Sequence, residues 1–128
     1  MNRREFTRAT GLAGLMALSG CQFSEEESRM YGIIGKMMAN DGRRDELIAI
    51  LLDGTKDMPG CLSYVIARDQ ADDNALWITE VWESKAQHEA SLSLESVQQA
   101  ISAGRPLIAG FGERFETSPV GGHGLSQQ

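Results

Sequence analysis

The sequence predicts one α+β domain, with four strands and two helical segments, behind a short N-terminal leader. Four segments have the length and the apolar, β-branched or aromatic composition of strands, and two segments between them carry apolar residues with the period of a helix. The chain has 128 residues, of which 41% are hydrophobic and 23% charged. That length and composition suit one compact domain, and the chain is too short for two.

The charge balance is acidic, with a formal net charge of −6 at pH 7. Binding to nucleic acid needs clustered Lys and Arg against the phosphate backbone, and we find no such cluster after the first eight residues. We therefore expect no nucleic-acid partner.

The first 21 residues resemble a twin-arginine export signal that ends in a lipobox. Arg3-Arg4 is followed by Phe6, and a weakly apolar stretch leads to Leu18-Ser19-Gly20-Cys21. A stretch of about 8 to 11 apolar residues is too short to span a bilayer, which takes about 20. The resemblance implies cleavage before Cys21, lipidation of its sulfur, and export to the periplasmic or cell-surface side, with the lipid as the only membrane contact.

The alternative for residues 1–20 is an N-terminal helix of the folded domain. These residues carry three Arg and one Glu, a net charge of +2, so the chain without them would carry −8. Residues 21–29 are expected to be a flexible linker, because they contain three consecutive Glu and no apolar periodicity. A Cys21–Cys61 disulfide is a competing interpretation, and it would exclude lipidation.

The folded domain is expected over residues 30–120, followed by a flexible Gly-rich tail at 121–128. Turn and stop signals separate its elements: Asn40-Asp41-Gly42, Met58-Pro59-Gly60 and Gly104-Arg105-Pro106. The expected strands are residues 30–39, 61–69, 75–83 and 107–120, and the expected helical segments are residues 43–58 and 84–104.

Both helical segments are amphipathic, and the second is divided into two pieces. Ser84 is placed to cap the first of these pieces. The apolar faces comprise Leu47, Ile48, Leu51 and Leu52 on the first segment, and Leu94, Val97 and Ile101 on the second.

The resulting order, β-α-β-β-α-β, is the split arrangement of ferredoxin-like folds. One antiparallel sheet would carry both helices on one face, and Met, Tyr, Phe and Trp side chains on the other face should not be left to water. A second copy of the sheet would cover that face, so we expect a homodimer that forms a dimeric α/β barrel. The alternative is a monomer whose open face is largely polar.

The segments MPGCLSYVIARD and TEVWESKAQHEA, with this order of elements, resemble the antibiotic biosynthesis monooxygenase family and its quinol monooxygenase-like members. The resemblance covers about residues 30–120. It implies a dimeric barrel with one pocket per subunit between sheet and helices. It also implies oxygenation of a quinol-like or phenolic aromatic by dioxygen, with no cofactor. A non-catalytic small-molecule binding or stress-response protein, or a haem-binding relative, is the alternative.

Two positions depart from the family pattern. Members often carry a His nine residues after the Trp, where this chain has Ser91, and His88 lies three residues earlier. Haem-degrading relatives use an Asn in the first strand, and residues 30–39 contain none. The second departure weakens haem degradation more than quinol oxidation.

Glu80, Trp82 and His88 are the candidate catalytic residues. Glu80 shares a strand face with Ile78 and Trp82, and an unpaired buried charge costs several kcal/mol. Either an arginine holds Glu80 as a structural carboxylate, or Glu80 is desolvated beside Trp82 and takes a proton from a phenol or quinol. The candidate arginines are Arg68, Arg105 and Arg114.

The other candidates also have two interpretations. Trp82 could be the wall of a flat substrate pocket or plain core. His88 has charged neighbours that favour a solvated imidazole, although an inward His88 would be a natural proton acceptor. Tyr64 and Met37, on neighbouring strands, could bind substrate or belong to the core. The two His and two Cys are widely spaced and predict no metal site.

Overall fold

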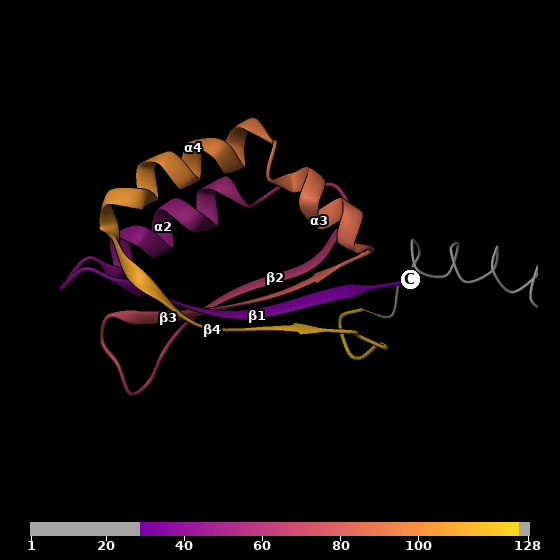
Figure 1. The fold of residues 1–128 in the computed structure, drawn as a ribbon, viewed down its shortest axis with the longest axis horizontal. Helices are drawn as coiled ribbons and strands as arrows, with labels where there is room; N and C mark the ends of the chain where they lie inside the picture. The colour runs from indigo at the N-terminus through magenta and orange to yellow at the C-terminus, as the bar shows by residue number, and fades with distance from the viewer. Residues whose placement is uncertain (1–28, 126–128) are drawn as a thin grey trace, which may run out of the picture.

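The computed structural model describes residues 29–125, so the expected leader and linker up to residue 28, including Cys21, lie outside the described residues. Helices cover one face of a four-stranded sheet (Figure 1). The elements are β1 (Tyr31–Ala39), α2 (Arg44–Gly54), β2 (Cys61–Arg68), β3 (Ala75–Trp82), α3 (Lys85–Ser91), α4 (Glu95–Gly104), a 3-10 turn (Arg105–Leu107) and β4 (Ile108–Thr117).

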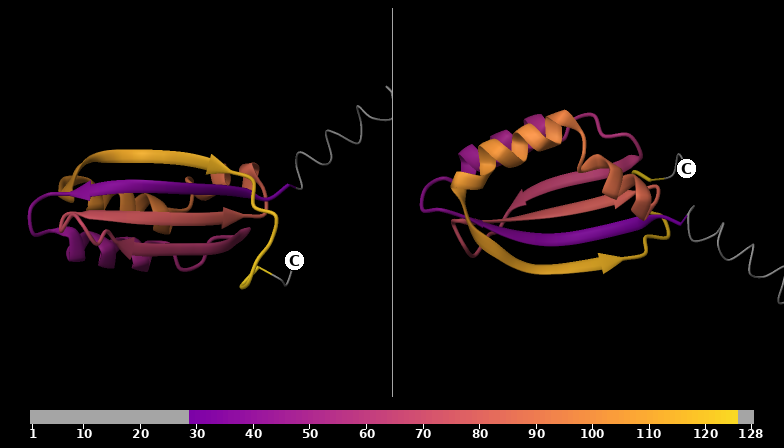
Figure 2. Two further views of the ribbon diagram at one scale, coloured as in Figure 1. Left: turned by 90° about the horizontal axis from the view of Figure 1, so that it is seen from below. Right: turned by 45° about the horizontal axis from the view of Figure 1, so that its top comes forward.

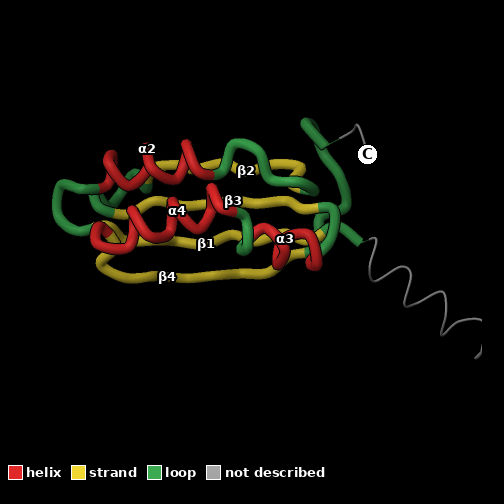
Figure 3. The backbone as a smooth tube through the Cα atoms, turned by 90° about the horizontal axis from the view of Figure 1, so that it is seen from above, coloured by secondary structure: helices red, strands yellow, loops and turns green. Residues whose placement is uncertain are grey.

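The sheet is antiparallel throughout, in the order β2-β3-β1-β4. The ferredoxin-like α+β fold predicted from the sequence is therefore confirmed. Seen from above, α2 and α4 lie over β2, β3 and β1, while most of β4 forms an uncovered margin of the sheet and α3 lies near its far end (Figure 3). The short α3 lies at the end of the sheet where β3 finishes (Figure 3).

The predicted capping of the second helical segment is confirmed. Ser84 Oγ accepts a hydrogen bond from the Gln87 backbone N–H at 3.2 Å, which satisfies one of the free N–H groups at the start of α3. The break between α3 and α4 was also predicted. On α4, Val97 is buried and Leu94 and Ile101 are partly buried, as the apolar stripe indicated.

The first helix differs from the prediction in length and orientation. α2 ends at Gly54, four residues before the expected stop at Met58. Gly54 is buried where α2 packs against α4, and a Cβ on it would lie 2.5 Å from Ala100 Cβ, so only glycine allows this close approach. Leu47 is fully buried, but Leu52 is 52% exposed, so its predicted place on the core face was wrong.

The core beneath the helices has two buried clusters. One contains Ala39, Leu47, Leu76, Ile78 and Leu107, and the other contains Met58, Trp82 and Val97. Tyr64 packs against both clusters and joins them.

The opposite face of the sheet has no covering helix among the described residues, as both further views show (Figure 2). Strand alternation and register place apolar side chains there, and Val65 and Phe115 are each 54% exposed. Both tyrosines lie on the helix face instead, because Tyr31 pairs with Trp82 and Tyr64 with Glu80. The expectation that Tyr contributes to the open face was therefore wrong. The apolar residues of this open face are Ile34, Met38, Val65, Trp77, Val81 and Phe115, and Lys36 and Thr79 lie on the same face.

Candidate active site

The three candidate catalytic residues form one cluster at the end of the sheet. β3 places Glu80 and Trp82 two residues apart on the helix face, and α3 turns back over them after Ser84. Trp82 Nε1 donates a hydrogen bond to Glu80 Oε1 at 2.8 Å. His88 Nε2 lies 3.9 Å from the same oxygen. The side chains of Glu80 and His88 are only 14% and 16% exposed, so the cluster is shielded from water.

The arginine partner proposed for Glu80 is not what the structure shows. Among the described residues, no arginine lies within ion-pair distance of Glu80, and Arg68 pairs with Asp45 at 3.0 Å. The indole N–H of Trp82 is the hydrogen-bond donor that satisfies this mostly buried carboxylate. Within the described part of the chain, the second oxygen, Glu80 Oε2, accepts no protein hydrogen bond, so it can accept one from a ligand.

His88 points inward, so the solvated interpretation was wrong. Its ring lies edge-on to Trp82, with centroids 5.5 Å apart and planes at 72°, and 5.6 Å from the Tyr31 ring. His88 Nδ1 is buried and has no hydrogen-bond partner among the described residues. Ser91, which stands where the resemblance leads us to expect His, donates to the His88 carbonyl at 2.6 Å and so reinforces the helix rather than the cluster.

Glu80 also lies on the wall of a cavity of about 370 Å³ among β1, β3 and β4, which we call the strand cavity. Gly35 forms part of it in the middle of β1, and a Cβ there would meet only Arg114 Cγ, at 4.0 Å. The glycine therefore leaves space that any larger residue would fill. The lining residues are Ile33, Gly35, Lys36, Met37, Ile78, Glu80, Phe111, Gly112 and Arg114.

A second cavity of about 540 Å³ lies between α2, α4 and β4, and we call it the helix cavity. Met37 and Phe111 line both cavities, so the two are neighbours. Of the predicted site residues, Glu80 and Met37 therefore reach cavity space. Trp82, His88 and Tyr64 line neither cavity.

Tyr64 lies opposite Glu80 in the β2–β3 register, among core side chains. Burial raises the pKa of the Tyr64 phenol well above its usual value, and the nearby Glu80 and Cys61 raise it further. The folded protein therefore holds Tyr64 in its neutral form at pH values where an unfolded tyrosine ionises.

This difference predicts a loss of stability in alkali. The raised pKa favours folding fully below the unfolded value of about 10, and the contribution is lost as pH rises above it. The free energy of unfolding should fall by up to about 1.4 kcal/mol per pH unit on this account. Urea unfolding of wild type and Tyr64→Phe between neutral pH and alkali tests this. Tyr64→Phe should show the shallower slope, and parallel slopes would contradict the expectation.

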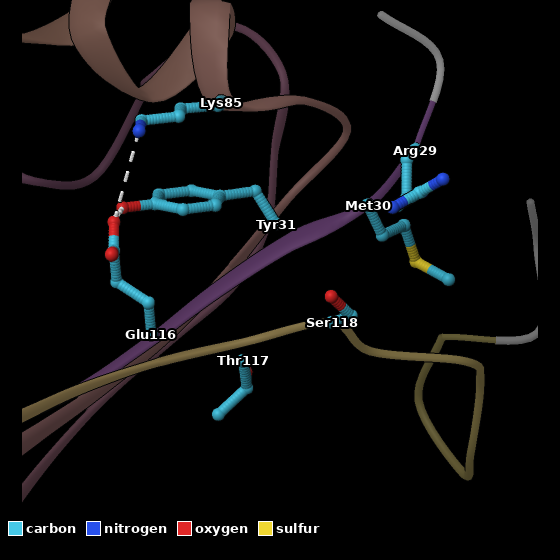
Figure 4. A pocket seen from close by; sticks show the side chains of 7 residues that line it. All are labelled: Arg29, Met30, Tyr31, Lys85, Glu116, Thr117 and Ser118. Atoms are coloured by element: carbon cyan, nitrogen blue, oxygen red, sulfur yellow. Dashed lines mark hydrogen bonds and ion pairs between the residues drawn. The ribbon is translucent and has the colours of Figure 1, made fainter. Parts of the chain in front are cut away.

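A third pocket, of about 230 Å³, surrounds Tyr31 and was not foreseen from the sequence (Figure 4). The Tyr31 hydroxyl donates to Glu116 Oε2, and Lys85 Nζ lies 4.0 Å from that oxygen and 5.8 Å from the Tyr31 ring centroid. Desolvation and the bond to Glu116 raise the pKa of Tyr31, and the same hydrogen bond lowers the pKa of Glu116. The Tyr31 ring also lies 5.6 Å from the His88 ring between centroids, so Tyr31 contacts both this pocket and the cluster.

Residues 29–125 contain neither a metal-binding cluster nor a membrane-spanning helix. The described chain contains no group of three or more His, Cys, Asp or Glu residues arranged to hold a metal ion. None of the helices in this part of the chain is long and apolar enough to cross a membrane.

Comparisons with known proteins give a consistent result. A family model described as antibiotic biosynthesis monooxygenase matches residues 30–103. A solved structure from Chloroflexus aurantiacus J-10-fl, which carries the name of that family, is 64% identical, covers 76% of this chain and 99% of its own, and superposes with a TM-score of 0.74.

Two more distant relatives support the fold or match only part of this chain. A Caulobacter crescentus CB15 structure that carries the same family name is 19% identical, covers 77% of this chain and 96% of its own, and has a TM-score of 0.67, which shows the fold alone. A curated relative, the uncharacterized protein sll1783 of Synechocystis, is 28% identical over 57 residues, or 42% of this chain. The match spans only 39% of that relative's length.

Proposed function

The chain belongs to the antibiotic biosynthesis monooxygenase family, and on this premise we propose that it oxygenates a quinol-like or phenolic aromatic with dioxygen, without a cofactor. The observation that carries the proposal is the setting of Glu80. Its carboxylate is 14% exposed, lies on the wall of the strand cavity, and has one oxygen occupied by Trp82 and the other free of protein hydrogen bonds among the described residues.

The chemistry requires few polar groups. Removal of a proton turns a quinol into an electron-rich anion that can pass electrons directly to dioxygen. One oxygen atom enters the ring as a hydroxyl, and the other leaves as water. The substrate supplies all four electrons, two from the conversion of quinol to quinone and two from the ring C–H bond. The protein must therefore supply one base, a fixed position for the ring and exclusion of water.

Each residue of the cluster has a role in this proposal. Glu80 Oε2 accepts the substrate proton, and the Trp82 N–H fixes the carboxylate through Oε1. His88 Nε2 lies 3.9 Å from Oε1, beyond hydrogen-bond distance, so in this proposal the two groups approach more closely when substrate binds and the proton then passes from Glu80 to His88. Trp82 is 1% exposed, so we assign it this positioning role rather than stacking on the substrate. Met37 forms the cavity wall against the ring, and Tyr64 supports Glu80 from the paired strand.

Oxygen uptake with a panel of quinols tests the function. We expect wild-type protein to consume one dioxygen per quinol, faster than the uncatalysed reaction, and to yield a hydroxyquinone. Dioxygen labelled with the heavy isotope should place one labelled atom in that product. If no quinol in the panel is consumed above the uncatalysed rate, the non-catalytic binding alternative holds instead.

We also propose that the open face is the interface of a homodimer. The apolar side chains of the open face, of which Val65 and Phe115 are each 54% exposed, favour a cover, and a second copy of the sheet would offer the same surface. Sedimentation should therefore report two copies at micromolar concentration. Val65→Asp should release single copies, whereas Leu52→Asp, on the outer side of α2 with similar exposure, should not. Single copies of wild type over the whole concentration range would contradict the interface.

A further inference from the structure

The helix cavity is larger than the strand cavity and chemically different from it. Its volume is about 540 Å³ against about 370 Å³, and it contains no acid. Arg105 is its one charged lining residue. Such a surface suits a hydrocarbon group, because apart from Arg105 its side chains are apolar. The lining residues are Met37, Leu47, Leu51, Ala100, Ile101, Gly104, Arg105, Ile108, Ala109, Gly110 and Phe111.

The two cavities share a boundary at Met37 and Phe111. Phe111 is 70% exposed and lies on β4, the strand at the margin of the sheet beyond α2 and α4 (Figure 3). Met37 is unbranched and adaptable in shape. A single molecule could therefore extend from Glu80 past these two side chains into the space between α2 and α4.

We propose that the substrate is a quinol or phenol with a flexible aliphatic chain, whose ring occupies the strand cavity and whose chain occupies the helix cavity. This inference rests on the proposed function and specifies its substrate class. The polar end of the molecule meets the one carboxylate of the strand cavity. The chain meets the apolar residues of α2, α4 and β4, which would otherwise line a water-filled groove.

Binding of oxidised quinones tests whether the helix cavity binds an aliphatic chain, and it does not require turnover. The probes are benzoquinones with the same ring and a methyl, pentyl or decyl substituent, measured by calorimetry. Affinity should rise by up to about fourfold for each methylene that becomes buried, since a buried methylene contributes about 0.8 kcal/mol. The gain should level off once the helix cavity is full. Equal affinities across the series would overturn the inference.

Two cavity-filling variants test where the aliphatic chain of the ligand binds. Leu51→Trp, from α2, and Ile101→Trp, from α4, should abolish the gain from the longer substituents and leave the methyl probe unaffected. The matched control is Leu52→Trp, because Leu52 lies next to Leu51 but is 52% exposed and lines neither cavity. Two filling variants keep the test valid if thermal unfolding shows that one of them fails to fold. If both variants fold and their affinity still rises with the length of the quinone substituent, the aliphatic chain binds elsewhere and the inference fails.

The remaining outcomes separate this inference from the proposed function. If short-chain quinols are oxygenated but longer chains bind no better, the function stands and the chain inference falls. If long-chain quinones bind in the helix cavity but no quinol is oxygenated, the chain inference stands and the function falls. If a second copy fills the helix cavity, Leu51→Trp should change the sedimentation of the protein and chain length should have no effect, which also overturns the inference.

Discussion

Replacing Glu80 by Gln should lower the turnover number for oxygen uptake by about 10²- to 10⁴-fold, the usual contribution of a positioned general base. Glutamine has nearly the same shape, and its amide oxygen can still accept the Trp82 N–H that holds Glu80 Oε1 at 2.8 Å. It cannot take a proton from the substrate. The Michaelis constant and the thermal unfolding midpoint should therefore change little.

The matched control is Glu83→Gln, one residue beyond the end of β3 and exposed to solvent. It removes the same charge from the same region and should leave the turnover number unchanged. If the turnover number of Glu80→Gln lies within a few-fold of wild type, Glu80 is not the general base, whether or not the proposed substrate is correct.

Replacing Trp82 by Ala should destabilise the protein by about 3 to 5 kcal/mol, the usual cost of truncating a large buried aromatic. Trp82 is 1% exposed and packs with Met58 and Val97. Its loss also leaves the mostly buried Glu80 carboxylate without its hydrogen-bond donor, which costs further. Urea unfolding measures the change in the free energy of unfolding.

Trp82→Phe separates the two contributions. Phenylalanine keeps most of the ring but has no N–H, so it should cost less stability than alanine while still releasing Glu80 Oε1. Its effect should therefore be larger on turnover than on folding. A Trp82→Ala protein within about 1 kcal/mol of wild type would contradict the assignment of Trp82 to the core.

The fold was predictable because its signals are local. Ser84 caps α3 by a contact three residues along the chain, and the strand and helix periods are visible in short windows. The orientation of α2 was predicted only approximately, since Leu47, Ile48, Leu51 and Leu52 span a broad arc of the helix. The part of that arc that is buried depends on how α2 packs against α4, where Gly54 meets Ala100, and sequence alone does not indicate that contact.

The site was predictable only in part. Strand alternation correctly placed Glu80 and Trp82 on one face, but it gave no reason to prefer the indole N–H over an arginine as the carboxylate's partner. The direction of His88 depends on how α3 turns after Ser84, which is a tertiary feature. Tyr31 was missed because its place beside His88 follows from pairing with Trp82, 51 positions away in the sequence.

Anaerobic mixing of the protein with a quinol tests the central claim most directly, because it isolates proton removal from the reaction with dioxygen. We expect wild type, at a pH where free quinol is neutral, to show the absorption of the bound quinol anion, and Glu80→Gln to bind the quinol without that absorption. Bound quinol that stays neutral in wild type, or that ionises equally in Glu80→Gln, would contradict the account.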